Sequence, residues 1–297
     1  MFEELGRVLA SVPLLGHLPA TLLLDRSGAA EVVAPLAAGA ERAAFVPARP
    51  PTDLEDGWTV EPAIGLTRAA APSLADGKVT GTVSWVPDAP VADVLVVVLD
   101  DGRAVHVRGA DAAIEPATVY DVTRSLGHVT LDGAPATLLD PEPGDTAAAW
   151  YVAQTLLAAE AVGAIEVALQ VSVAYAKERH TFGRAIGSYQ AVKHELVEIL
   201  RGLDNSRSLM YYAGWAAQDK PDEFPLASSA FRLAAGKAFD HAGRAQISVH
   251  GGIGATWEHG APLYFRRAQL SRRLLGGTAG AADRVAGELL SQARAAA

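Results

Sequence analysis

The residues best suited to bind a ligand concentrate between positions 175 and 190, in the stretch YAKERHTFGRAIGSYQ. Within it, Arg179 and Arg184 flank Thr181 and Phe182. A guanidinium group can bind two phosphate oxygens at once through its planar fork, and a threonine hydroxyl can add another hydrogen bond. The phenyl ring adds a flat apolar surface. This combination suits the pyrophosphate of a nucleotide, although a helix end with solvated charges and a core phenylalanine would use the same residues.

Residues 250–254, HGGIG, form a second candidate site. Three glycines within four positions permit a positive φ and the close approach of a ligand to the backbone, but a helix C-cap and turn would use them too. Other routes to catalysis are closed. The chain has no cysteine, its eight histidines lack a metal-binding spacing, and it contains no GxSxG, Walker or strand-linked GxGxxG motif.

The composition predicts a soluble globular protein. Half of the 297 residues are hydrophobic, a fifth are charged, and the formal net charge is -9. That charge argues against wholesale binding to nucleic acid or to an acidic lipid surface. The N-terminal sequence lacks the basic and apolar regions of a signal peptide, and no apolar run approaches the ~20 residues that cross a bilayer. We therefore expect a cytoplasmic protein without a membrane span.

Two elements must position the first candidate site, one helix leading into it and one leading out. Val162, Ile165, Leu169 and Val173 recur at helical spacing before it, and a second apolar stripe begins at Tyr189. Three further helices are expected over 226–248, 262–274 and 279–296. Short links that contain glycine or proline separate these helices, as in an antiparallel bundle. Residues 143–297 are thus predicted to form a C-terminal helical bundle.

The preceding residues have a different character. Residues 1–50 show apolar spacing typical of short helices, including 32–44, and are too few for a core of their own. Residues 51–142 are predicted to form a small antiparallel β-domain, with strands over 78–86, 94–99 and 104–108. Asp-Gly pairs beside strand-like runs predict hairpin turns; they occur at 56–57, 76–77, 101–102 and 132–133. The predicted fold class is therefore α+β with several domains.

The two candidate sites also carry a family resemblance. YAKERHTFGRAIGSYQAVKHELVEI, followed about fifty residues later by VHGGIGATWEHGAPLYFRRAQL, resembles the C-terminal half of the FAD-dependent acyl-CoA dehydrogenases. The resemblance implies an N-terminal helical domain (here truncated), a β-domain and a four-helix bundle, assembled as a tetramer with FAD between subunits. It implies FAD contacts at Arg179, Thr181, Phe182, Gln190, Gly251, Gly252, Trp85 and Thr278.

The sequence departs from the family pattern at the positions that carry catalysis. The resemblance places the catalytic base at Gly276 or, in other members, at Ala153, and neither residue has a carboxylate. Pro87 replaces a hydroxyl residue that hydrogen-bonds the flavin, and Ser248 replaces a glutamine before the glycine pair. This pattern resembles the non-catalytic subunit of heteromeric α2β2 acyl-CoA dehydrogenases, which are known from steroid side-chain breakdown and share each FAD between two different subunits.

The resemblance therefore implies a subunit that helps to bind FAD while a catalytic partner dehydrogenates an acyl-CoA thioester. Electron-transfer flavoprotein is the expected electron acceptor. Two alternatives stay open. One is a self-sufficient homomeric dehydrogenase with a relocated base, for which Glu160 and Glu258 are the weak candidates. The other is a structural pseudoenzyme that binds no flavin.

Overall fold

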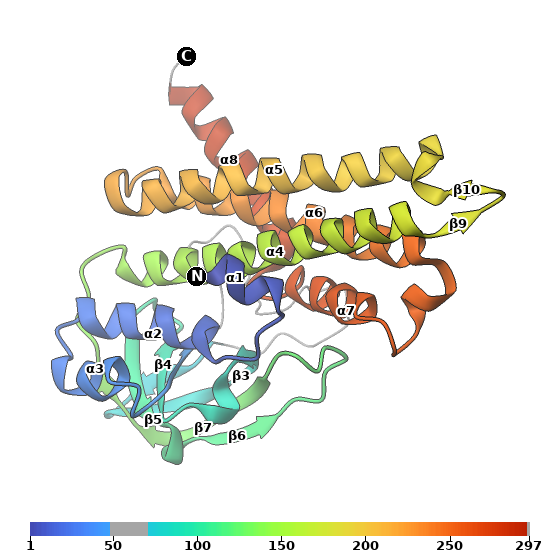
Figure 1. Ribbon diagram of the computed structural model, residues 1–297. Coiled ribbons are helices and arrows are strands. Elements are labelled where there is room, and N and C mark those ends of the chain that lie inside the picture. Colours follow the sequence, from blue (N-terminus) through green and yellow to red (C-terminus); the bar gives the residue numbers. More distant parts are fainter. Residues whose placement is uncertain (48–70, 296–297) are drawn as a thin grey trace. The chain divides into compact units, whose positions relative to one another are not determined.

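The computed structural model describes residues 1–47 and 71–295 (Figure 1). The Asp-Gly pair at 56–57 and the expected domain boundary at 50/51 lie outside the described residues. The chain forms two compact units. A helical unit comprises residues 1–10, 155–272 and the chain from 284 onward, whereas a β unit comprises residues 11–154 and 273–283. Residues 1–47 are thus divided between the two units.

The β unit contains two four-stranded sheets. The first has the strand order β1–β4–β5–β8 and the second has the order β2–β3–β7–β6. Buried valines, leucines and alanines from both sheets form one core, which explains the strand-like runs in the sequence. The strands are β1 (Ala43–Val46), β2 (Ser73–Ala75), β3 (Lys78–Pro87), β4 (Val94–Val98), β5 (Ala104–Arg108), β6 (Ala113–Pro116), β7 (Leu126–Pro135) and β8 (Thr137–Leu138).

Two details of this unit correct the sequence-based expectations. Residues 43–46 form β1, which is fully buried and pairs in parallel with β4, although this region was expected to be helical. This sheet is therefore not purely antiparallel. Residues 43–46 form a strand because their burial in the sheet outweighs their weak helical spacing. The pair at 76–77 does form a two-residue turn, whereas Gly133 (φ 65°) lies inside β7 at a register shift, as a β-bulge.

Two short helices, α2 (Leu14–Arg26) and α3 (Ala30–Ala37), belong to the β unit. Gly16 brings α2 close to β3, since a side chain there would collide with the carbonyl oxygen of Pro87. The amide of Gly16 donates to Asp88 Oδ2 at 2.8 Å, and the amide of Ala43 donates to His17 Nδ1 at 3.1 Å. These bonds fix α2 against the strands.

The helical unit confirms the helices expected in the C-terminal half. Helix α4 runs into the first candidate site and α5 runs out of it, followed by three more helices (Figure 1). Helix α5 begins at Gln190, one residue after Tyr189, where the second apolar stripe was expected to begin. The bounds are α4 (Asp145–Glu178), α5 (Gln190–Asp219), α6 (Phe224–His250), α7 (Ala261–Ser271) and α8 (Gly277–Ala295).

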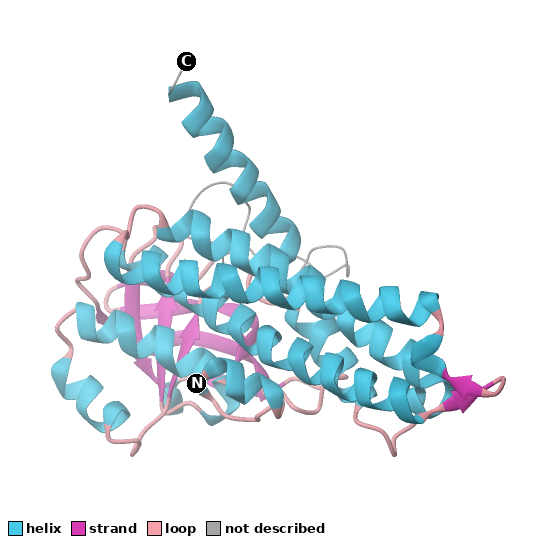
Figure 2. Cartoon of the chain, turned by 45° about the horizontal axis from the view of Figure 1, so that its top comes forward, coloured by secondary structure: helices cyan, strands magenta, loops and turns pink. Residues whose placement is uncertain are grey.

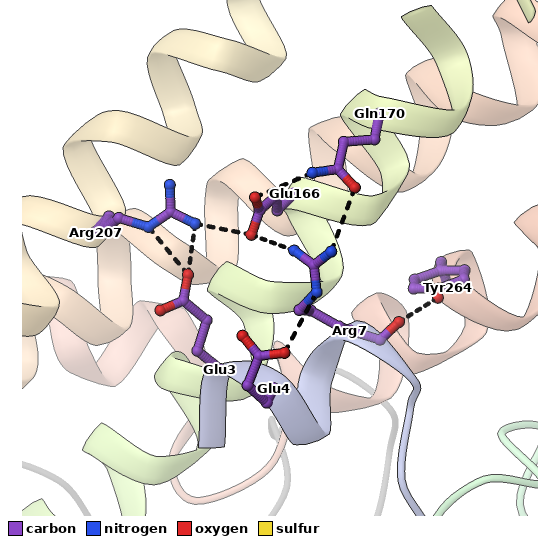
Figure 3. A network of polar contacts seen from close by, with 7 residues as sticks. All are labelled: Glu3, Glu4, Arg7, Glu166, Gln170, Arg207 and Tyr264. Carbon is purple, nitrogen blue, oxygen red and sulfur yellow. Dashed lines mark hydrogen bonds and ion pairs between the residues drawn. The ribbon is translucent and has the colours of Figure 1, made fainter. Parts of the chain in front are cut away.

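A short N-terminal helix, α1 (Phe2–Arg7), packs on α4 within the helical unit. Glycines make the close approach possible, since Gly6 faces the backbone of Glu160 and Gly163 faces the backbone of Glu3. A network of charged and polar side chains joins α1 to α4, α5 and α7 (Figure 3). Its members are Glu3, Glu4, Arg7, Glu166, Gln170, Arg207 and Tyr264.

Helix α4 corrects the expectation that no apolar segment is long enough for a membrane. Among the described residues it is the one helix whose length and composition would allow it to cross a bilayer. However, 61% of its most apolar window is buried inside the protein. A helix that is apolar on all sides is expected where other elements surround it, so this burial favours a core helix.

Candidate functional site

The first candidate site folds as a hairpin between α4 and α5. Strands β9 (His180–Thr181) and β10 (Arg184–Ala185) pair in antiparallel fashion, with Thr181 opposite Arg184. The two residues between them both have positive φ, 50° at Phe182 and 78° at Gly183, which is the geometry of a type I′ turn. The hairpin extends past the ends of α4 and α5 in both Figure 1 and Figure 2.

Phe182 is unusual at this position in two respects. Its side chain is 93% exposed at the hairpin tip, whereas the sequence left open a core phenylalanine. A bulky residue with positive φ is an outlier, and such backbone strain costs about 1–3 kcal/mol. Residues of this kind cluster at ligand and partner sites. The ring therefore does not stabilise this chain by itself, and it is free to contact a ligand or a second subunit.

Tyr189 connects the hairpin to the start of α5. Its hydroxyl donates to the carbonyl oxygen of Thr181 at 3.1 Å, and the guanidinium of Arg184 lies 4.2 Å from the centre of its ring. Helix α5 begins at Gln190 without a side-chain cap. The first amides of such a helix lack intrahelical acceptors and favour an anion. Free backbone amides that can bind an anion thus lie at the start of α5, beside the hairpin.

An open cavity of about 490 Å³ lies between the hairpin, the first turn of α5 and the end of α6. Thr181 and Phe182 contribute to it together with Ser248, which is more than sixty residues away in the sequence. Arg179 is exposed two residues before Thr181 but does not line the cavity, and its guanidinium forms no ion pair with any residue in the described part of the chain. The lining residues are Thr181, Phe182, Ile186, Tyr189, Ala191, Val192, Glu195, Ser248 and Val249.

The glycine turn follows directly after α6. Gly251 ends the helix with φ 64°, and a 3-10 turn continues to Ala255. A side chain added at Gly251 or Gly252 would meet nothing within 4 Å, and both residues are exposed. Packing within this chain therefore does not require Gly252 to be glycine. The open backbone fits a ligand or subunit that approaches it from outside.

Sequence reasoning missed part of this lining. Tyr189 was expected only as the start of a helical stripe, and Ile186 and Val249 were given no role, yet all three line the cavity. The one sequence signal that Tyr189 could belong to the site was its position immediately before Gln190. The walls formed by Ile186 and Val249 come from segments that meet only in the folded chain.

The two family positions for a catalytic base come together in the β unit. Ala153 is 1% exposed on α4, and Gly276 lies in the turn before α8 with φ 81°. The side-chain amide of Gln154 donates to the carbonyl oxygen of Leu275 at 2.9 Å. Gln154 follows Ala153 and Leu275 precedes Gly276, so this bond holds the two positions near each other. A base at either position could therefore act on the same substrate atom, but neither residue has a side chain that accepts a proton.

The two weak candidates for a relocated base lie elsewhere. Glu160 is buried on α4 in an ion pair with Arg267, with 3.2 Å between Oε2 and Nη1. Glu258 is exposed and lies three residues before α7 begins at Ala261, not at the helix start as expected. Glu160 thus has a structural role that accounts for its burial.

The remaining predicted contacts belong to the β unit. Trp85 lies at the irregularity of β3 with φ 62°, and its ring makes an edge contact with His128, at 4.8 Å between centroids. Its indole nitrogen is buried without a hydrogen-bond partner among the described residues. Thr278 lies in the first turn of α8. Pro87 is buried and offers no donor.

Comparison with known proteins identifies the class. The family model "Acyl-CoA dehydrogenase, C-terminal domain" matches residues 148–290. The chain is 35% identical to acyl-CoA dehydrogenase IpdE2 of Mycobacterium tuberculosis, over 71% of the chain and 65% of that protein. It is 31% identical to IpdE2 of Mycolicibacterium smegmatis, over 93% of the chain and 73% of that protein. The chain belongs to the acyl-CoA dehydrogenase family, whose members are FAD-dependent oxidoreductases. It spans just under two thirds of the first of these relatives.

Solved structures agree with this assignment. The chain superposes on the Tcur3481-Tcur3483 steroid ACAD with a TM-score of 0.83 and 28% identity, covering 99% of this chain and 80% of the other. It matches the ChsE4-ChsE5 complex from Mycobacterium tuberculosis with a TM-score of 0.83 and 25% identity, over 97% and 79%. The fold expected from the sequence, an α+β acyl-CoA dehydrogenase fold with a C-terminal bundle, is confirmed.

Proposed function

We propose that this chain is the non-catalytic subunit of a heteromeric acyl-CoA dehydrogenase, with α2β2 composition, in which it supplies part of an FAD site that a catalytic partner completes. One observation carries the proposal. The cavity at the hairpin, with Arg179 and the exposed glycine turn, suits a dinucleotide, whereas Ala153 and Gly276 leave the chain without a base at either family position.

The residues of the cavity suit the two chemical parts of FAD that would reach them. Arg179 and the free amides at the start of α5 would hold the pyrophosphate by charge and hydrogen bonds. Phe182, Tyr189 and the apolar cavity wall would contact the flat adenosine part. The glycine turn would let this ligand approach the backbone without collision.

In this proposal the partner subunit also performs the proton transfer. When bound, FAD supplies the hydride acceptor for oxidation of an acyl-CoA to the 2,3-enoyl-CoA. The reaction also needs a carboxylate within hydrogen-bond reach of the α-carbon. In this chain the corresponding positions hold a methyl group and a hydrogen atom, which supports a base supplied by the other subunit.

The substrate class follows from similarity and is part of the proposal. The solved structures that resemble this chain include a steroid ACAD, which supports an acyl-CoA with a bulky acyl group. Electron-transfer flavoprotein is the proposed acceptor, as in the wider family, and the cytoplasm is the proposed location. Trp85 and Thr278 stay proposed FAD contacts in the β unit.

The test is to purify the chain alone and together with the acyl-CoA dehydrogenase encoded beside it, and to measure FAD per chain and turnover. In the complex, Arg179→Ala should weaken FAD binding at least about tenfold, the order expected for one charge-assisted contact. Arg201→Ala is the matched control, because Arg201 is also exposed but pairs with Glu198 on α5.

Each alternative has its own outcome. Full flavin content and turnover in the lone chain would contradict the heteromeric assignment and support a self-sufficient enzyme. A complex without flavin, or one whose FAD content ignores Arg179→Ala, would favour the flavin-free structural role.

A further inference from the structure

Three aromatic rings pack against one another at the base of the glycine turn in the helical unit. The ring of His250, at the end of α6, lies 4.4 Å from that of Tyr175 on α4 and 4.3 Å from that of His259. His250 is 4% exposed. His250 and His259 lie at the two ends of the segment that contains Gly251 and Gly252. Their contact therefore closes this loop at its base.

The hydrogen bonds of the two histidines define where their protons lie. His250 Nδ1 lies 2.7 Å from the carbonyl oxygen of Gln246, and a carbonyl can only accept, so this nitrogen carries hydrogen. Its Nε2 is buried without a partner in the described chain. His259 Nδ1 accepts from the amide of Ala261 at 3.1 Å, so this nitrogen is unprotonated. The ring of His259 is therefore neutral in this arrangement.

A positive charge on His259 would break the arrangement in three ways. Its Nδ1 could no longer accept from Ala261, the first residue of α7. The charge would face the positive end of that helix, and it would lie against His250. Burial, and then the nearby His250, lower the pKa of His259 below 6.5. Tyr175 from α4 contributes a phenol ring to the cluster, and the neighbouring Glu258 is exposed.

We propose that His250 and His259 are positioning residues that hold the Gly251-Gly252 backbone in its ligand-binding form only while the ring of His259 is neutral. The inference rests on the proposed function, since it makes FAD retention by the complex dependent on pH. Protonation of His259 releases the base of the loop, and the backbone that faces the ligand loses its fixed conformation.

The experiment compares FAD dissociation from the purified complex at about pH 8 and about pH 5.5, on either side of an ordinary histidine pKa. Dissociation from the unaltered complex should be at least about fivefold faster at the lower pH, about 1 kcal/mol. In His259→Asn, Oδ1 can replace Nδ1 as acceptor without titrating, so the ratio should fall below about twofold. His259→Phe keeps a ring but loses the acceptor, and should release FAD faster at both pH values.

The control is His106→Asn in the β unit. His106 is also half-buried with a pKa lowered mainly by burial, so its variant should keep the unaltered pH response. Thermal unfolding at both pH values separates loss of FAD from loss of fold. Dissociation that does not change with pH, or an unaltered pH response in His259→Asn, would overturn the proposal.

A second readout does not require FAD. In the lone chain, amide hydrogen exchange over residues 251–256 should be faster at the lower pH after correction for intrinsic rates, and His259→Asn should remove this difference. If the complex holds no FAD but exchange behaves in this way, the proposed function fails while the positioning role of the histidines stands. If FAD is bound and exchange does not respond, the histidine proposal fails and the proposed function stands.

Discussion

Replacing Gly163 by alanine is predicted to destabilise the helical unit, because this glycine lets α1 pack against α4. A β-carbon built at Gly163 would lie 2.8 Å from the carbonyl carbon of Glu3 and 2.9 Å from the amide nitrogen of Arg7, and closer still to the oxygen of Glu3. All these atoms are backbone, so no side chain can rotate away. Helix α1 must move.

The size of the effect follows from three contributions. Forcing an extra methyl group into a packed contact costs about 1–3 kcal/mol. Movement of α1 also weakens the ion pairs Arg7–Glu166 and Glu3–Arg207, which are partly exposed and worth about 0.2–1 kcal/mol each. Alanine offsets about 0.5–1 kcal/mol by its better helix propensity. The expected net loss is about 2 kcal/mol.

The assay is urea unfolding of the purified chain, followed by tryptophan fluorescence and circular dichroism. Gly214→Ala is the matched control, because Gly214 lies inside α5 and an added β-carbon there meets nothing within 4 Å. That variant should gain about 0.5–1 kcal/mol. If Gly163→Ala proves as stable as Gly214→Ala, the close packing of α1 on α4 is refuted.

Three further predictions concern single residues. Phe182→Asn should stabilise the chain by about 1 kcal/mol, because asparagine tolerates positive φ, and should lower the FAD content of the complex. Thermal unfolding measures the stability and flavin absorbance measures the FAD content. A less stable variant would argue against strain at the hairpin tip. Burial lowers the pKa of His17 below 6.5, so its neutral form contributes stability that is complete above pH 6.5 and is lost as the pH falls further. The urea midpoint should therefore fall less between about pH 8 and about pH 5.5 in His17→Asn, which keeps an acceptor for Ala43, than in the unaltered chain; equal falls would remove His17 from the pH response. Glu160→Gln should cost about 3 kcal/mol, because it removes the carboxylate that pairs with the buried guanidinium of Arg267. Turnover per folded complex should stay unchanged in Glu160→Gln and in Glu258→Gln, and its loss in either variant would support a relocated base.

Much of the fold could be predicted from the sequence, because its signals are local. Apolar spacing placed α6, α7 and α8 within a few residues of their observed bounds, and Asp76-Gly77 marked the turn between β2 and β3. Strand β1 was missed, because residues 43–46 become a strand only through pairing with β4. Gly133 was misleading, since a turn and a bulge both need a glycine with positive φ.

The sequence by itself determined which chemical groups the protein has and lacks. It placed Arg179, Thr181 and Phe182 in one short run, and it put alanine and glycine at both family positions of the base. No folding can supply a carboxylate that these residues do not have. The lack of a base at Ala153 and Gly276 therefore follows from residue type alone.

Only the tertiary structure decided how these groups are presented. It turned Phe182 outward at a strained hairpin tip, left the glycine turn open, and joined Gln154 to Leu275 across 121 positions. It also brought the ring of His250 into contact with those of Tyr175 and His259. These contacts join segments that are distant in the chain, and their geometry depends on how whole helices pack, which residue type and local spacing do not encode.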